Sequence, residues 1–312
     1  MSTAQVKAWA RFRANKGAVL GLLFLLVGSG LSTLGPRIVG GDPWAIVGRP
    51  FLPPSWEQPL GTDTLGRSVL AGLLYGGRVS MLIGLAAATI SVVIGVVVGA
   101  VAAFYGGWVD DVLMRLTEFF QIVPAFVLVL VLIALFEPSL GSVITGIGVV
   151  SWPAMARLAR AEFLSLRHRE FVLAERAIGA GDLKIMVRTI LPNAMPVIAV
   201  YSSLLVATAL LFESSLSFLG LTDPNYISWG FMVGASRSAL QRAWWLAAFP
   251  GIAILVTVVS INLVGDGLND ALNAKGWVVA APHTDAIDAR PETTVPAITG
   301  ASEGHLSRTE AR

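Results

Sequence analysis

The sequence has few of the residue types that form catalytic or metal-binding sites. It contains no cysteine and only three histidines, His168, His283 and His305, among 312 residues. The lack of thiols excludes disulfides, thiolate metal sites and cysteine nucleophiles, although it does not reveal the compartment. The histidines are far apart, so a histidine-based metal site is not expected. No catalytic triad, paired catalytic carboxylates or phosphate-binding G-K-[ST] loop is found, so we expect no enzyme activity in this chain.

Charge is also scarce. Only 13% of the residues are charged and 55% are hydrophobic, with a mean hydropathy of +0.73. A soluble domain carries about 25% charged residues. This deficit and several long apolar runs predict an all-α, polytopic membrane protein. The net charge of +2 and the pI of about 9.1 come from basic loops, so nucleic acid is not an expected partner.

Six apolar runs are long enough to be transmembrane helices. We place these spans at about residues 17–34, 81–104, 119–136, 139–156, 194–219 and 245–264, within one transmembrane domain of residues 17–275. A cleaved signal peptide is the alternative for the first run, but the run is too long and no A-x-A site follows. Residues 276–312 are rich in Ala, Thr, Pro and acidic residues, which predicts a disordered tail.

The distribution of cations predicts the orientation. With the basic leader, residues 1–16, inside, the inner segments hold thirteen Lys and Arg residues and the outer segments hold six. The bias favours both termini in the cytoplasm, with the protein in the cytoplasmic membrane. Tryptophans near the predicted span ends fit aromatic belts at the lipid interface.

The connections differ in character. Residues 35–79 form a Pro- and Gly-rich outer connection, and its residues 64–75 suit a short interfacial helix. Residues 105–115 are expected to be a short inner loop that leaves Asp110 and Asp111 in solvent. The second span contains Gly95-x-x-x-Gly99, a small-residue face for close helix contact.

The longest inner connection, residues 157–192, is strongly basic. Seven cations fall in it: Arg157, Arg160, Arg167, Arg169, Arg176, Lys184 and Arg188. The absence of Gly and Pro predicts a helix over residues 158–178, which Gly179 and Gly181 should end. Asp182 is the predicted N-cap of a second helix, residues 183–190, before Pro192 ends the unit or opens the next span. Taken alone, the segment could also be an ordinary basic loop that obeys the positive-inside rule.

This segment resembles the cytoplasmic EAA loop of ABC-importer permeases. The family pattern is Glu-Ala-Ala, three residues, Gly, nine residues, then Ile-x-Leu-Pro. Leu173, Glu175 and Thr189 depart from it, standing where the family has Glu, Ala and Ile. In the family this loop docks a coupling helix into the ATPase subunit. The resemblance therefore implies a set of ATPase-coupling residues, namely Ala174, Glu175, Arg176, Ala177, Gly179, Ala180, Gly181, Asp182, Leu191 and Pro192.

A second resemblance lies in the outer connection. The phrase GTDTLGRSVLAGLLYGGRVS is similar to the GTD-x-x-GRD segment of the dipeptide, oligopeptide and nickel branch of these permeases, with Ser68 at the last Asp. The GDGLND ending of the last span resembles the GDGLRD of that branch. The outer motif residues are Gly61, Thr62, Asp63, Gly66 and Arg67.

The resemblance implies a type I ABC-importer permease fold with a cytoplasmic coupling helix. It implies the permease subunit of an ATP-driven importer of di- or oligopeptides, with membrane lipid around it. The implied partners are a second permease, two ATP-binding subunits that bind ATP and Mg, and an extracytoplasmic solute-binding protein. The chain itself would hold no cofactor or metal. The same machinery could import nickel, metal chelates or glutathione, and an ion-coupled secondary transporter or a membrane scaffold are alternatives from other classes.

Glu213 is the notable ionisable residue inside a span. A carboxylate within the bilayer is unfavourable unless it is paired or faces a wet cavity. Glu213 is therefore a candidate for the translocation path, and the alternative, which we favour, is a carboxylate near the outer end that stabilises helix packing. Arg115 and Glu118 are spaced to pair at i and i+3.

Overall fold

The computed structural model describes residues 3–39 and 42–272, so the predicted tail, residues 276–312, lies outside the described residues. In the described ranges the chain is helical and the β structure is limited to isolated bridges. The elements are α1 (Thr3–Ala14), α2 (Lys16–Val39), α3 (Val69–Tyr105), α4 (Gly107–Ile122), α5 (Ala125–Leu135), α6 (Leu140–Arg167), α7 (Glu170–Ala177), α8 (Asp182–Lys184), a π-helical turn (Ile185–Ile190), α9 (Leu191–Phe218), α10 (Trp229–Ser236) and α11 (Trp245–Leu272).

The helices have the lengths that a bilayer requires. Five helical runs in the described part can cross a membrane: Lys16–Gly35, Val69–Tyr105, Leu140–Arg167, Asp182–Phe218 and Trp245–Leu272. The bent pair α4 and α5 gives a sixth if it is counted as one span. The predicted all-α polytopic class is therefore confirmed.

The span predicted at residues 119–136 is divided between two helices, α4 and α5. The axis bends by 83° between α4 and α5. Val123 is extended, with φ −88° and ψ 131°, and Pro124 follows it. A proline has no amide hydrogen and disfavours helical geometry in the residue before it, which explains the break at this point.

The boundaries near α3 also differ from the expectation. No separate interfacial helix forms at residues 64–75, because α3 begins at Val69 and continues to Tyr105. The hydroxyl of Ser68 caps its first turn by accepting a hydrogen bond from the Ala71 amide at 3.4 Å. Residues 107–122 form α4, so Asp110 and Asp111 do not lie in a loop.

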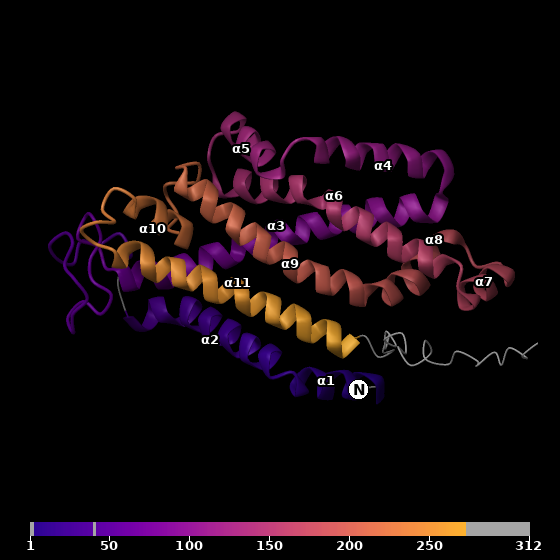
Figure 1. Ribbon diagram of the computed structural model, residues 1–312, viewed down its shortest axis with the longest axis horizontal. Helices are drawn as coiled ribbons and strands as arrows, with labels where there is room; N and C mark the ends of the chain where they lie inside the picture. The colour runs from indigo at the N-terminus through magenta and orange to yellow at the C-terminus, as the bar shows by residue number, and fades with distance from the viewer. Residues whose placement is uncertain (1–2, 40–41, 273–312) are drawn as a thin grey trace, which may run out of the picture. The chain divides into compact units, whose positions relative to one another are not determined.

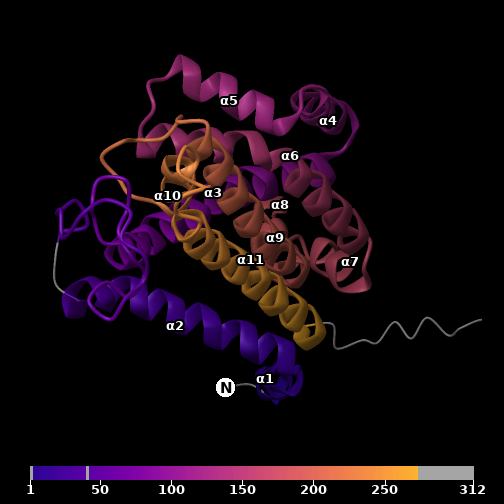
Figure 2. The ribbon, with the colours of Figure 1, turned by 60° about the vertical axis from the view of Figure 1, so that its left-hand side comes forward.

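The long helix α3 lies at the centre of the bundle, where it packs against α2, α6 and α9. Figure 1 shows α6 crossing α3, and in Figure 2 α4 and α5 cover the far side of α6. Gly95 and Gly99 of α3 face Met155 and Ala156 of α6, at a separation that leaves no room for a Cβ atom. The predicted role of these two glycines in close helix contact is therefore confirmed.

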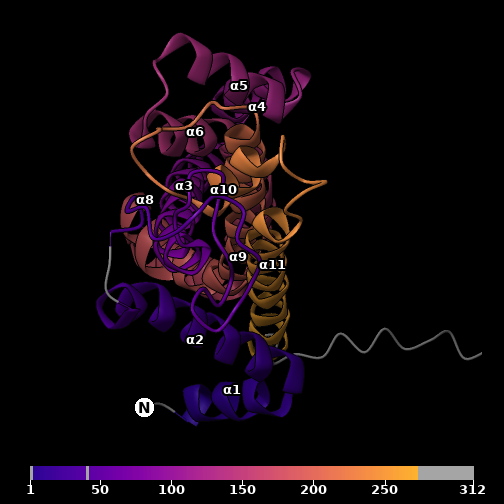
Figure 3. The same ribbon diagram turned by 90° about the vertical axis from the view of Figure 1, so that its left-hand side faces the viewer.

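The bundle has two distinct ends. Figure 3 looks onto the end that carries α10 and the segment of residues 42–68, which we call the cap end. The opposite end carries α7 and α8, and we call it the loop end (Figure 1). At the loop end α1 is held against α11, where the Asn15 side-chain amide donates a hydrogen bond to Asp270 at 2.9 Å.

Candidate functional site

The loop end is built around a turn that only glycine adopts easily. Gly179 follows α7 with φ +81°. The Ala180 amide donates to the Glu175 carbonyl and the Gly179 amide donates to the Arg176 carbonyl, both at 3.1 Å. These two bonds form a Schellman motif, which ends a helix with a left-handed residue. The expected glycine stop at Gly179 is therefore present.

The second helix of the loop differs from its expected form. Gly181, with φ −68° and ψ 148°, is the N-cap of α8 and has no side-chain capping bond. The prediction that Asp182 is the N-cap is wrong, since Asp182 is the first residue of α8. The helical backbone then passes through the π-helical turn into α9, with Pro192 in the first turn of α9. The predicted first helix is also interrupted, because α6 ends at Arg167 and α7 starts at Glu170.

The loop is packed firmly onto the bundle. Val172, Ile185, Met186 and Ile190 are buried in one cluster together with Phe104 of α3. This cluster fixes α7 and the π-helical turn to the membrane helices at the loop end. A movement of α7 or of the π-helical turn would therefore be transmitted directly to α3 and α9, because no flexible linker separates them.

The loop exposes large apolar side chains among charged ones. Phe171, Leu173, Ile178, Leu183 and Val187 are exposed, and the exposed fraction of Ile178 is 84%. Exposed apolar side chains gathered on one rigid element are typical of a protein-binding surface. Of the predicted coupling residues, most are exposed beside these five: Ala174, Arg176, Ala177, Gly179, Gly181, Asp182 and Pro192, whereas Glu175, Ala180 and Leu191 are partly buried.

Two residues that depart from the EAA pattern contact each other. The Thr189 hydroxyl donates a hydrogen bond to Glu175 Oε2 at 2.7 Å. The bond joins α7 to the π-helical turn across the Gly179 turn. Arg176 of α7 also places its guanidinium over the Phe104 ring, 5.4 Å from the centroid.

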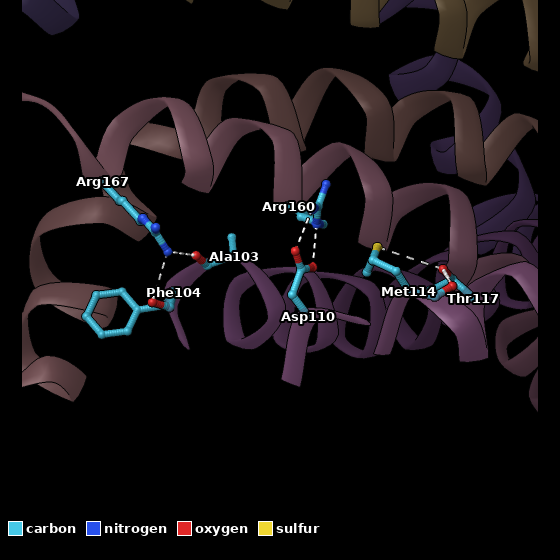
Figure 4. Close-up of polar contacts among 7 residues, drawn as sticks. All are labelled: Ala103, Phe104, Asp110, Met114, Thr117, Arg160 and Arg167. Atoms are coloured by element: carbon cyan, nitrogen blue, oxygen red, sulfur yellow. Dashed lines mark hydrogen bonds and ion pairs between the residues drawn. The ribbon is translucent and has the colours of Figure 1, made fainter. Parts of the chain in front are cut away.

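The cations of the loop are not all free for a partner. Figure 4 shows Arg160 of α6 bound to Asp110 of α4 through two hydrogen bonds of 2.5 Å, from Nε and Nη2. It also shows Arg167 donating to the carbonyls of Ala103 and Phe104, at 2.6 and 3.2 Å. The expected solvent exposure of Asp110 is therefore wrong, because its side chain is only 16% exposed. Sequence reasoning missed the pair because 50 residues separate its members and no local spacing links them.

Glu213 lies near the cap end of α9 and is completely buried, with an exposed fraction of 0%. It accepts hydrogen bonds from Ser217 at 2.8 Å, Ser228 at 2.5 Å and Ser80 at 3.4 Å. Ser80 belongs to α3 and Ser228 caps the N-terminus of α10. A carboxylate beside a helix N-terminus is stabilised by the amide dipoles there. These contacts support the helix-packing alternative, and the place of Glu213 on a translocation path stays a prediction.

The outer motif residues shape the cap end. Gly61 and Gly66 have φ of +77° and +80°, and a Cβ on either would meet backbone atoms. The buried Thr62 hydroxyl accepts from the Leu52 amide and donates to the Arg49 carbonyl, at 2.9 and 2.6 Å. The segment is thus folded by its own turns.

The two remaining motif residues complete these turns. Asp63 Oδ1 accepts from the amides of Leu65 and Arg67, each at 2.8 Å. The Arg67 guanidinium lies 4.6 Å from the centroid of the Trp44 ring. All five motif residues therefore act first as folding elements of the cap end.

The described residues form a helical bundle of membrane-spanning length, with an ordered loop that bears exposed apolar side chains at one end. The chain belongs to the family described as binding-protein-dependent transport system inner membrane component, which matches residues 91–276. A second family, the N-terminal TM domain of oligopeptide transport permease C, matches residues 6–54. The protein is therefore a multi-pass inner membrane protein and a translocation component of an ABC importer.

Named relatives agree with this assignment. The di/tripeptide transport system permease protein DppC of Pseudomonas aeruginosa is 39% identical over 86% of this chain and 91% of its own length. The dipeptide transport system permease protein DppC of Bacillus subtilis is 38% identical over 86% of this chain and 85% of its own. The inward-facing MetNI methionine ABC transporter shares the fold, with a TM-score of 0.56, 17% identity, and coverage of 64% of this chain and 96% of that one.

Proposed function

We propose that this chain is the permease subunit of an ATP-driven importer of di- or oligopeptides. The relatives that it resembles over most of its length are named for dipeptide or di/tripeptide transport. ATP and Mg are bound by partner subunits, since no phosphate-binding loop occurs in the sequence. The assembly contains a second permease, two ATP-binding subunits and a solute-binding protein.

The observation that carries this proposal is the loop end. It exposes large apolar side chains, with Ile178 and Leu183 exposed by 84% and 68%, and it is anchored by a buried cluster that reaches into α3 and α9. Such a surface suits docking into a groove on an ATPase. Closure of two ATPases would then move the loop, and the spans would switch between outward-open and inward-open states.

The orientation follows from this role. The loop end and both termini lie in the cytoplasm, in agreement with the excess of Lys and Arg on the inner segments. The cap end lies on the other side, where residues 42–68 and α10 are the docking surface for the solute-binding protein. Trp56 is the most exposed aromatic residue there among the described residues and is fully exposed.

The test is purification of the tagged chain from its native membrane in mild detergent, followed by identification of the proteins that remain bound. A second permease and P-loop ATPases are expected, and the complex in liposomes should take up labelled dipeptides when ATP is present. A matched complex with a Leu183→Glu substitution should lose the ATPases while the permeases stay together. Purification of the chain alone, or as a homo-oligomer that binds no ATPase in several detergents, would overturn the proposal.

A further inference from the structure

The helix pair α4 and α5 is interrupted by irregular backbone at Val123 and Pro124. The sixteen residues of α4 rise about 24 Å, which is less than the roughly 30 Å of a hydrocarbon core. Helix α4 alone is therefore too short to cross the layer, and where α4 and α5 together form one span the break lies within it. Irregular backbone is tolerated there only where protein buries it or where it lines a water-filled cavity. Val123 has an exposed fraction of 39%, so burial within this chain is incomplete.

The break leaves main-chain groups of both kinds without helical partners. The amides of Ala125, Phe126 and Val127 open α5, and Pro124 offers no side-chain cap. The carbonyls of the last turn of α4 likewise lack a helical donor, because the Val123 amide donates no capping hydrogen bond to them. No hydrogen bond to these groups is found within the described part of the chain. The break thus presents both donors and acceptors.

A groove runs beside this break. It has a volume of about 310 Å³ and is lined by residues of α4, α5, α6 and α9. Its polar side chains are Gln121, Ser151, Tyr201 and Thr208, and Phe120 and Phe212 are among its apolar ones. None of the residues that line it carries a charge. The groove therefore offers neutral hydrogen-bonding groups between aromatic faces.

A second proline contributes to the same wall. Pro153 of α6 lines the groove together with Val123, Pro124 and Ala125 of the break. The groove is therefore bordered by the irregular backbone between α4 and α5 and by a proline of the neighbouring helix.

We propose that this groove is where the chain contacts the passing peptide, through hydrogen bonds to the peptide's main chain. The inference rests on the proposed function and names the place of contact. Unpaired amides and carbonyls complement the carbonyl and amide of a peptide bond, whatever its side chains are. The lack of charged lining residues means that the groove selects for no particular side-chain charge. Neutral contacts of this kind are also weak enough to let the substrate leave.

The neighbouring residues Phe119 and Phe120 give a matched pair for the test. Phe120 lines the groove, whereas Phe119 does not line it and is 69% exposed. Each is replaced in the complete complex by the photoreactive p-benzoyl-phenylalanine, and radiolabelled alanyl-alanine is supplied with ATP during illumination. Label is expected on the chain with the probe at 120, about tenfold above the chain with the probe at 119.

Other outcomes decide against the inference. Equal labelling at the two positions, or a crosslink from position 120 to the second permease, would overturn the inference. The proposed function would remain intact in that case as long as the complex still takes up the dipeptide. If the complex takes up no peptide at all, the proposed function fails and the inference fails with it.

A second measurement uses the volume of the groove. Ala154→Trp fills the groove from α6, and Val131→Trp on α5 is the control, because Val131 is 45% exposed and does not line the groove. Uptake should fall about tenfold for Ala154→Trp and stay near normal for Val131→Trp. Assembly is checked by co-purification of the partners. Normal uptake by an assembled Ala154→Trp complex would contradict the inference.

Discussion

Glu175 and Thr189 are joined by a hydrogen bond of 2.7 Å across the Gly179 turn. Both stand at positions where the loop departs from the EAA pattern, so the two departures form one contact. The contact ties α7 to the helix that continues into α9. The loop therefore keeps its geometry by an internal bond where the family pattern has apolar residues.

The first prediction concerns this bond. Thr189→Val keeps the shape of the side chain and removes the donor, which should weaken the attachment of α7 by about 1 kcal/mol. Hydrogen exchange of the α7 amides should rise several-fold, and fewer peptides should be carried per ATP hydrolysed. Thr189→Ser keeps the hydroxyl and is the control. Unchanged exchange in Thr189→Val would show that the bond does not hold α7.

The second prediction separates backbone strain from side-chain size at Gly179. No atom lies within 4 Å of a Cβ built there, but φ is +81°. Gly179→Ala and Gly179→Leu should therefore both destabilise the turn by about 1–2 kcal/mol and uncouple ATP hydrolysis from uptake to a similar degree. Gly179→Asn should be milder, because asparagine tolerates this conformation.

Gly181 is the matched control for that series. It also has no atom within 4 Å of a built Cβ, and its φ is −68°. Gly181→Ala should impair coupling less than Gly179→Ala does in the same assay of ATP consumed per peptide, because it introduces no backbone strain. If Gly179→Leu is much worse than Gly179→Ala, crowding at the docked ATPase and not strain is the cause.

The third prediction concerns the link between α4 and α6. Asp110→Ala leaves Arg160 partly buried without its carboxylate and should lower the free energy of unfolding by about 1–3 kcal/mol. A double-mutant cycle with Arg160→Ala, measured by thermal unfolding in detergent, isolates the coupling energy. The exposed pair Arg115 and Glu118, 3.9 Å apart, is the control. Its removal should change stability by less than about 0.5 kcal/mol, and an equal effect of both pairs would contradict the prediction.

The fourth prediction concerns Glu213. Glu213→Leu removes the acceptor of three serine hydroxyls and should destabilise the cap end, by about 1–3 kcal/mol for each buried group that stays unpaired. Glu213→Gln keeps one acceptor oxygen and should be milder. Protease access to the segment around α10 reports the loss of this anchor. If Glu213→Leu blocks uptake in a fully folded complex, the result would favour a role of Glu213 in the translocation path over a role in helix packing.

The sequence was sufficient for the features that depend on local chemistry. Apolar run lengths predicted the membrane helices, and the glycine spacing predicted both the Gly179 stop and the close contact at Gly95 and Gly99. These features need only hydropathy, backbone freedom or the absence of a side chain. The α7 exposure pattern could not be predicted in this way, because burial depends on which bundle face the loop packs against.

The errors have a common physical origin. Pro124 falls inside the predicted span of residues 119–136, and whether a proline bends or breaks a helix depends on the neighbours that receive the freed groups. Asp110 looked solvated because its partner Arg160 is distant in sequence. The start of α3 was misplaced because Ser68 can cap a helix only once the turns of Asp63 and Gly66 have set its backbone. In each case a tertiary contact outweighs the local conformational preference on which the prediction was based.

The continuity of α3 has a consequence for how the two ends of the protein influence each other. This helix of 37 residues is about 56 Å long. The Val69 amide at its start bonds to Gly61 of the cap end, and Phe104 near its finish lies under Arg176 of the loop end. If binding at either end depends on the tilt of this rod, thermodynamic reciprocity requires that each partner change the affinity of the other by the same factor. A solute-binding protein would then recruit the ATPases as strongly as the ATPases recruit it.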